Sequence, residues 1–189
     1  MRGRDKFKKY KKIINIFVFF YSIFPKSVQK KMLEMHRNTK GIKGIIIRYA
    51  LIKNISLSCG DNVVIGPNIY LLHPENITFG SNISIHPMSY IEGFGGITIG
   101  NDVSIAHGTT IMSVTHLHDD LNIPIRDQGV EKQPIIIENN VWIGAKTTIL
   151  GGNTIRSGVI VGANAVVTKN IEENKIVAGV PARVIKERK

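Results

Sequence analysis

Two histidines and two aspartates lie within the eight residues 113–120, SVTHLHDD. Imidazole and carboxylate groups are the usual general bases and metal ligands of proteins near neutral pH. The same residue types are also common in solvated loops. Whether this segment does chemistry therefore depends on the elements that precede and follow it.

A six-residue period runs through the chain on both sides of this segment. The recurring sites are apolar, and all but Cys59 and Phe79 are Ile, Leu or Val: Cys59, Ile65, Leu71, Phe79, Ile85, Ile91, Ile99, Ile105, Ile111, Ile137, Ile143, Ile149, Ile155, Val161 and Val167. A hexapeptide period is typical of a parallel β-helix, in which three short strands close one coil of about 18 residues. We therefore predict an all-β solenoid lined by these residues, with Gly or Asn at corners that require a positive φ.

An insertion interrupts the period. Ile137 and Ile155 are 18 residues apart, whereas Ile99 and Ile137 are 38 apart. The surplus over one coil is about 18 residues. It falls at about 113–134 and predicts a loop that leaves the solenoid, with the histidines at its start.

Charge divides the 189 residues into two parts. Residues 1–53 hold 15 Lys and Arg against Asp5 and Glu34, a net charge of +13, whereas residues 54–189 hold 10 Lys and Arg against 12 acidic residues, a net charge of −2. We predict a basic, partly helical N-terminal arm (1–53) attached to a β-helix domain (54–189). Cys59 is the only cysteine, so no intrachain disulfide can form, and we expect a reducing, cytoplasmic location.

The arm passes from basic residues into an apolar run, Ile13 to Phe24, that is too short to span a bilayer as a helix. Either its apolar side packs on the domain or on a neighbouring subunit, or the helix lies on the inner face of an anionic membrane with its phenylalanines inserted. We favour the peripheral membrane contact. Nucleic acid is not an expected partner, because the aromatic residues form one block instead of alternating with basic residues.

Four segments resemble the hexapeptide-repeat acyltransferases: ITIGNDVSIAHGTTI (97–111), VWIGAKTTIL (141–150), VGANAVVTKNI (161–171) and VAGVPARVIKE (177–187). The closest branch is that of the maltose and galactoside O-acetyltransferases and the enzymes that acetylate capsule, exopolysaccharide and O-antigen sugars. The resemblance covers roughly residues 59–187. It implies a left-handed β-helix, a homotrimer, acetyl-CoA in the groove between coils, and an active site shared by two subunits. Pro181 separately predicts the start of a short C-terminal helix.

The resemblance also implies a catalytic base. In the family this is a histidine just after the strand where the long loop departs, and MSVTHLH has His116 at that position. His118, two residues further on, is the alternative. Glu92 and Asp119 are candidate carboxylates for the second imidazole nitrogen, and His107, at a coil corner, is a candidate neighbour of the acceptor.

For coenzyme A, the resemblance points to the late coils, where the cationic side chains suit the phosphates of the nucleotide end. The candidate residues are Trp142, Gly144, Ala145, Ala163, Thr168, Lys169, Arg183 and Lys186. No metal cofactor is expected.

We therefore predict an O-acetyltransferase that moves an acetyl group from acetyl-CoA to a hydroxyl of a sugar or polysaccharide precursor. Two other functions fit the same solenoid. A γ-class carbonic anhydrase has this fold and holds zinc with three histidines, but the spacing of His116 and His118 does not match its pattern. A non-catalytic, membrane-recruited scaffold would need neither a histidine at the start of the loop nor the VTKN and GVPAR segments.

Overall fold

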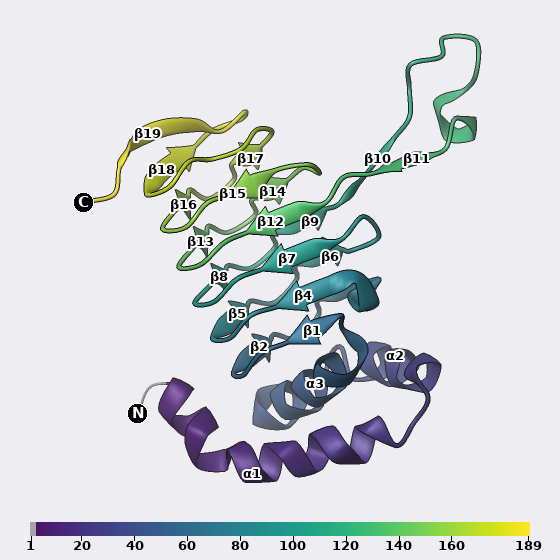
Figure 1. The fold of residues 1–189 in the computed structure, drawn as a ribbon, viewed down its shortest axis with the longest axis vertical. Coiled ribbons are helices and arrows are strands. Elements are labelled where there is room, and N and C mark those ends of the chain that lie inside the picture. Colours follow the sequence, from purple (N-terminus) through teal and green to yellow (C-terminus); the bar gives the residue numbers. More distant parts are fainter. Residues whose placement is uncertain (1–2) are drawn as a thin grey trace.

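The computed structural model describes residues 3–189, with three helices followed by a parallel β-solenoid of about six turns (Figure 1). The helices are α1 (Gly3–Ser22), α2 (Lys26–Met35) and α3 (Gly41–Ile55). Pro25 separates α1 from α2, because its fixed φ and missing N–H are tolerated at a helix start and not inside one. Helix α3 packs against the first coil, and α1 and α2 pack on α3, so the helices form a cap at the N-terminal end of the solenoid.

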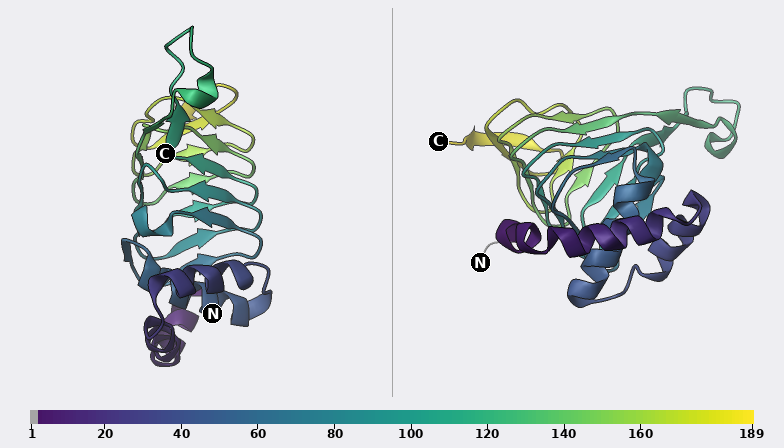
Figure 2. Two further views of the ribbon diagram at one scale, coloured as in Figure 1. Left: turned by 90° about the vertical axis from the view of Figure 1, so that its right-hand side faces the viewer. Right: turned by 60° about the horizontal axis from the view of Figure 1, so that its bottom comes forward.

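Each of the five complete coils contributes one strand to each of three sheets, and the second sheet has two further strands (Figure 2). Strands of neighbouring coils pair in parallel and in register, as in Phe79 with Ile99 and Ile91 with Ile111. The first sheet contains β1 (Ser58–Cys59), β4 (Ile77–Phe79), β7 (Ile97–Ile99), β12 (Ile135–Ile137) and β15 (Thr154–Ile155). The second contains β2 (Val63–Ile65), β5 (Ile83–Ile85), β8 (Ser104–Ile105), β13 (Trp142–Ile143), β16 (Ile160–Val161), β18 (Lys175–Ala178) and β19 (Arg183–Glu187). The third contains β3 (Tyr70–Leu72), β6 (Tyr90–Glu92), β9 (Thr110–Met112), β14 (Thr148–Ile149) and β17 (Val166–Val167).

The core is the column of side chains inside the solenoid, as the six-residue period predicts. Of the recurring sites, all but Cys59 and Leu71 are buried. These two belong to the first coil, which has a neighbouring coil on one side only and is covered on the other by the helical cap. They are partly buried and pack against the core.

Asparagine and glycine meet two different requirements at the coil corners. The positive φ angles predicted for corners fall on residues such as Asn62, Asn82, Asn140 and Asn164. A Cβ atom on Gly80, by contrast, would lie 2.6 Å from the carbonyl carbon of Gly100 in the next coil. Glycine is required at that position because the two backbones approach closely.

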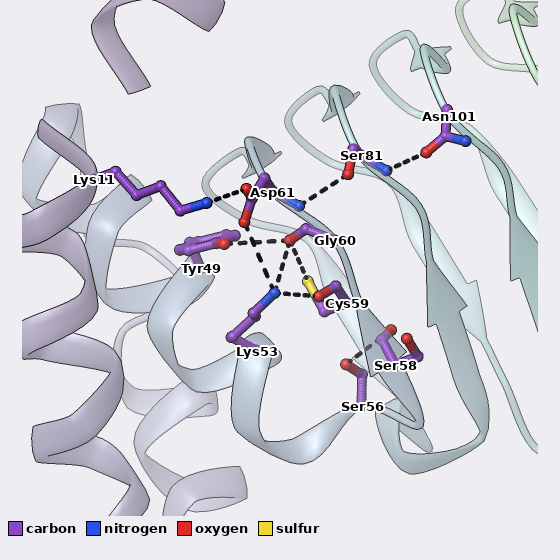
Figure 3. A network of polar contacts seen from close by, with 10 residues as sticks. All are labelled: Lys11, Tyr49, Lys53, Ser56, Ser58, Cys59, Gly60, Asp61, Ser81 and Asn101. Atoms are coloured by element: carbon purple, nitrogen blue, oxygen red, sulfur yellow. Dashed lines mark hydrogen bonds and ion pairs between the residues drawn. The ribbon is translucent and has the colours of Figure 1, made fainter. Parts of the chain in front are cut away.

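The cap is joined to the first coil by a polar network (Figure 3). Lys11 of α1 forms an ion pair with Asp61. From α3, the hydroxyl of Tyr49 donates to the carbonyl of Gly60 at 3.2 Å, and Lys53 donates to the carbonyl of Cys59. These contacts hold both α1 and α3 against the start of the solenoid.

The prediction of a short C-terminal helix is wrong. Residues 175–187 form two antiparallel strands, β18 and β19, and Pro181 lies in the turn between them. Strand β18 continues the second sheet beyond β16, and β19 covers its free edge. Pairing with an existing sheet edge therefore outweighs the preference of Pro181 for a helix start.

Candidate active site

An outward hairpin leaves the solenoid after β9, where the insertion is predicted. Strands β10 (Val114–His116) and β11 (Val130–Lys132) pair antiparallel, with His116 opposite Val130, and the tip contains the short 3₁₀ helix η2 (Ile125–Asp127). Figure 1 shows the hairpin projecting sideways from the stack of coils. The two strands lie within the range 113–134 expected for the loop, and they make its base an ordered two-stranded ribbon.

Ser113 fixes the base of the hairpin. Its side chain is fully buried, and its hydroxyl donates to the carbonyl of Glu92 at 2.8 Å and accepts from the N–H of Gly95 at 2.9 Å. The N–H of Gln133 donates to the carbonyl of Ser113 at 2.8 Å. The strand that carries His116 is thus held to the coil below it and to its own return strand. This residue was absent from the predicted site.

His116 and His118 differ in how their rings are held. Both are exposed. The Nδ1 atom of His118 lies 3.1 Å from the carbonyl oxygen of His116, so this nitrogen is engaged with the backbone. Among residues 3–189, the ring of His116 makes no hydrogen bond, and the residue is exposed at the end of β10. A general base must come within hydrogen-bond reach of the proton that it removes, and no contact within the described residues occupies this ring.

The carboxylates proposed to orient His116 do not contact it within one chain. Glu92 is buried, and its Oε1 accepts from the N–H of Phe94 at 2.7 Å, which stabilises the turn below the hairpin. Its Oε2 is buried without a hydrogen-bond partner among the described residues. Asp119 is exposed on the hairpin. His107 is exposed at a coil corner, and its carbonyl accepts from the N–H of Lys146 in the next coil.

The residues proposed for coenzyme A fall into two groups on either side of the face formed by β14 and β17. The first group lies at the corners before these strands. The N–H of Asn164 donates to the carbonyl of Ala145, and a Cβ on Gly144 would lie 2.6 Å from the nitrogen of Ala163. Trp142 is exposed on β13, directly before this corner.

The second group lies beyond β17. Thr168, Lys169 and Arg183 line one cavity of about 340 Å³, together with Asn170, Ile171, Val177, Ala182 and Val184. Lys186 is exposed on β19 and is not part of its lining. Within one chain, Thr168, Lys169 and Arg183 therefore lie together. Lys186 and the corner that follows Trp142 lie apart from them.

The thiol of Cys59 is unreactive. Burial, with a smaller contribution from Asp61 and against the effect of Lys53, raises the pKa of its thiol to about 12. The thiol is therefore protonated at neutral pH, which is the unreactive form. The described residues contain no group of three or more His, Cys, Asp or Glu side chains placed to hold a metal ion.

Comparisons with known proteins agree with this architecture. Residues 134–169 match a family model described as the hexapeptide repeat of succinyl-transferase. The galactoside O-acetyltransferase of Escherichia coli is 36% identical over 141 residues, which is 74% of this chain and 68% of that protein. A probable acetyltransferase of Mycobacterium tuberculosis is 42% identical over 78 residues, 41% of this chain but only 26% of that protein.

Solved structures extend the likeness over most of the chain. A maltose O-acetyltransferase from Clostridium difficile has 30% identity and a TM-score of 0.78, covering 87% of this chain and 86% of that one. A hexapeptide-repeat acetyltransferase from Vibrio cholerae, complexed with acetyl-CoA, has 27% identity and a TM-score of 0.76, covering 86% of each chain. This chain belongs to the hexapeptide-repeat acetyltransferases, enzymes that use acetyl-CoA as the acetyl donor.

Proposed function

We propose that this protein transfers the acetyl group of acetyl-CoA to a hydroxyl group of a sugar or a polysaccharide precursor, with His116 as the general base. An alcohol is a weak nucleophile until its proton is being removed, and imidazole is suited to this task near neutral pH. The hydroxyl attacks the thioester carbonyl, its proton passes to His116, and the thiolate of coenzyme A leaves. Cys59 does not act as an acyl carrier, because its thiol stays protonated.

One observation carries the proposal: within the described residues, an exposed imidazole without a hydrogen bond lies at the end of an ordered strand, on a hairpin that leaves the hexapeptide-repeat solenoid. The sugar acceptor is supported by the E. coli relative, which is named a galactoside O-acetyltransferase, and by the C. difficile structure, named a maltose O-acetyltransferase.

A homotrimer is part of the proposal. In a single chain the ring of His116 is solvent-exposed, and the coenzyme A candidates lie on two sides of one face. A neighbouring subunit would cover the imidazole and complete a groove. Light scattering on the purified full-length protein tests this, and a monomeric mass would contradict it. The membrane contact predicted for residues 1–53 also remains a proposal, and it concerns the end of the molecule away from the hairpin.

The activity is tested by following release of the coenzyme A thiol from acetyl-CoA against a panel of sugars, nucleotide-sugars and oligosaccharides. We expect His116→Ala to lower turnover of the best acceptor by about two to four orders of magnitude. His36→Ala, which removes a partly buried imidazole at the end of α2, is the matched control and should behave as wild type.

His118→Ala distinguishes the two hairpin histidines. Because the Nδ1 of His118 is engaged with the backbone, we expect a much smaller loss than for His116→Ala. Near-normal transfer by His116→Ala would refute its role as base, and a large loss with His118→Ala alone would move the assignment to His118. Carbon dioxide hydration that depends on bound zinc would instead favour the carbonic anhydrase alternative.

A further inference from the structure

Helix α1 is held in one orientation against the rest of the cap. Ile14 and Tyr21 are buried on its inner face, and Val18 packs there as well. The side-chain amide of Asn54 in α3 donates to the carbonyl of Val18 at 2.9 Å. At the other end of the helix, Lys11 forms the ion pair with Asp61 seen in Figure 3. These contacts prevent α1 from rotating its opposite face inward.

That opposite face carries large apolar side chains in solvent. Ile13, Ile16, Phe17, Phe20 and Ile23 recur at helical spacing, and Phe19 lies at the edge of the stripe. Their exposed fractions range from 39% for Phe17 to 71% for Phe19. A continuous stripe of exposed apolar side chains is a mark of an interaction surface. We call these six residues the outer stripe of α1.

The charges around the outer stripe are almost all positive. Lys8, Lys9 and Lys12 are exposed in the first half of α1, and Lys26 and Lys31 are exposed on α2. The only acidic residues from Gly3 to Ile55 are Asp5 and Glu34. The domain that follows has a net charge of −2, so the basic character is confined to the cap.

We infer that the outer stripe of α1 binds the surface of an anionic lipid bilayer, with the helix lying in the plane of the interface. An apolar stripe that enters the headgroup region and lysines that meet anionic lipids are the two parts of such a binding site. No helix within residues 3–189 is long and apolar enough to cross a membrane. Figure 1 shows α1 crossing the end of the solenoid, so the bilayer lies beyond the cap and the coils stack away from it.

The inference does not depend on acetyl transfer. If both hold, the enzyme works on acceptors close to a membrane, and three copies in a trimer would present three stripes to one bilayer, which increases avidity. A second copy of this chain is the competing occupant of the same face. It would need only the apolar residues and would leave the surrounding lysines without a role.

The test is co-sedimentation of the full-length protein with vesicles. The vesicles contain phosphatidylcholine alone or with about 30 mol% phosphatidylglycerol. We expect binding to the anionic vesicles only, weakened when NaCl is raised from about 0.15 M to about 0.5 M. The double variant Ile16→Ser with Phe20→Ser should reduce the bound fraction by about ten-fold or more.

The matched control is Leu121→Ser with Ile125→Ser, which removes two exposed apolar side chains from the hairpin and should leave vesicle binding unchanged. A second variant, Lys8→Glu with Lys9→Glu and Lys12→Glu, keeps the stripe intact and should abolish the preference for anionic vesicles. Circular dichroism verifies that each variant retains its helices. Turnover of a free sugar by the Ile16→Ser, Phe20→Ser variant should equal that of wild type.

Three outcomes would overturn the inference. Wild-type protein that stays in the supernatant with anionic vesicles has no such surface. Equal binding to neutral and anionic vesicles contradicts the role of the lysines. Light scattering that shows a larger species, reduced by Ile16→Ser with Phe20→Ser in the absence of lipid, identifies the stripe as a contact between copies. None of these results bears on acetyl transfer, which the thiol-release assay measures separately.

Discussion

The imidazole of His116 stands in solvent in a single chain, whereas a general base acts most effectively where water is excluded. We therefore propose that the bound substrates and a neighbouring subunit cover this imidazole. One chain by itself fixes the position of the strand that carries His116. Ser113, three residues earlier, is buried and ties the hairpin to the coil below it through two short hydrogen bonds.

Ser113→Ala tests this positioning role. The change leaves the carbonyl of Glu92 and the N–H of Gly95 without this partner, which should lower the free energy of unfolding by about 1–3 kcal/mol. It should also lower kcat, since the strand that carries His116 loses its fixed base, while the KM for acetyl-CoA changes little. Urea unfolding and steady-state kinetics measure the two effects.

Ser104→Ala is the control, because Ser104 lies on the outer side of β8, is only partly buried, and contacts another hydroxyl at 3.3 Å. It should change stability by about 0.5 kcal/mol or less. If Ser113→Ala and Ser104→Ala gave the same stability and the same kcat, Ser113 would have no special role.

At the scale of elements, the hairpin is an addition to the solenoid and not a part of its core. Residues 117–127 are exposed, and the coils above and below pair with each other directly through β9 and β14. The tip can therefore change without loss of the fold, which is typical of loops that select substrates.

Replacing residues 117–129 by Asn-Gly tests the role of the tip. The two strands remain joined by a tight turn, and His116 stays opposite Val130. We propose that this tip closes over the acceptor, and we therefore expect unchanged thermal stability and a loss of about 100-fold or more in transfer to the best sugar. Binding of acetyl-CoA, measured by calorimetry, should persist.

The control for the tip keeps its length and replaces residues 121–125 by Gly-Ser-Gly-Ser-Gly. It removes the exposed apolar side chains Leu121, Ile123 and Ile125 and retains His118 and Asp119. Full activity in the shortened variant would show that the tip takes no part in transfer. An intermediate loss in the control would assign part of the effect to the apolar side chains.

At the scale of the whole molecule, one buried arginine joins the helical cap to the solenoid. Arg48 is 1% exposed, and its Nε donates to the carbonyl of Ile65 in the first coil at 2.9 Å. Its Nη1 donates to the carbonyls of His36 and Thr39, which lie after α2. Gly44 allows this approach, since a Cβ there would lie 1.9 Å from the carbonyl oxygen of Thr39.

Arg48→Lys is expected to destabilise the protein although it keeps the positive charge. The three N–H donors of an ammonium belong to one nitrogen, whereas the guanidinium reaches these carbonyls from two separate nitrogens, so some buried carbonyls lose their partner. We expect the free energy of unfolding to fall by about 2–4 kcal/mol in urea titrations. Arg37→Lys, whose guanidinium stacks over the ring of Tyr70 at the surface, is the control and should have a small effect. Equal effects would contradict the bridging role.

The six-residue period was enough to predict the solenoid, the residues of its interior and the place where the hairpin leaves it. The period repeats the requirement for an apolar, inward-facing residue in every coil. The interruption at 113–134 is therefore easy to recognise. The left hand of the solenoid and the choice of His116 came from the resemblance to a family, because neither periodicity nor residue type carries that information.

Features that depend on contacts between distant parts of the chain could be seen only in the folded structure. The run from Ile13 to Phe24 is apolar apart from Asn15 and Ser22, so its pattern could not say that Ile14 and Tyr21 are buried and that Phe19 and Phe20 are not. The C-terminal segment became strands because an edge of the second sheet was available to it. In each case the deciding energy is a contact between residues distant in sequence, which local patterns do not encode.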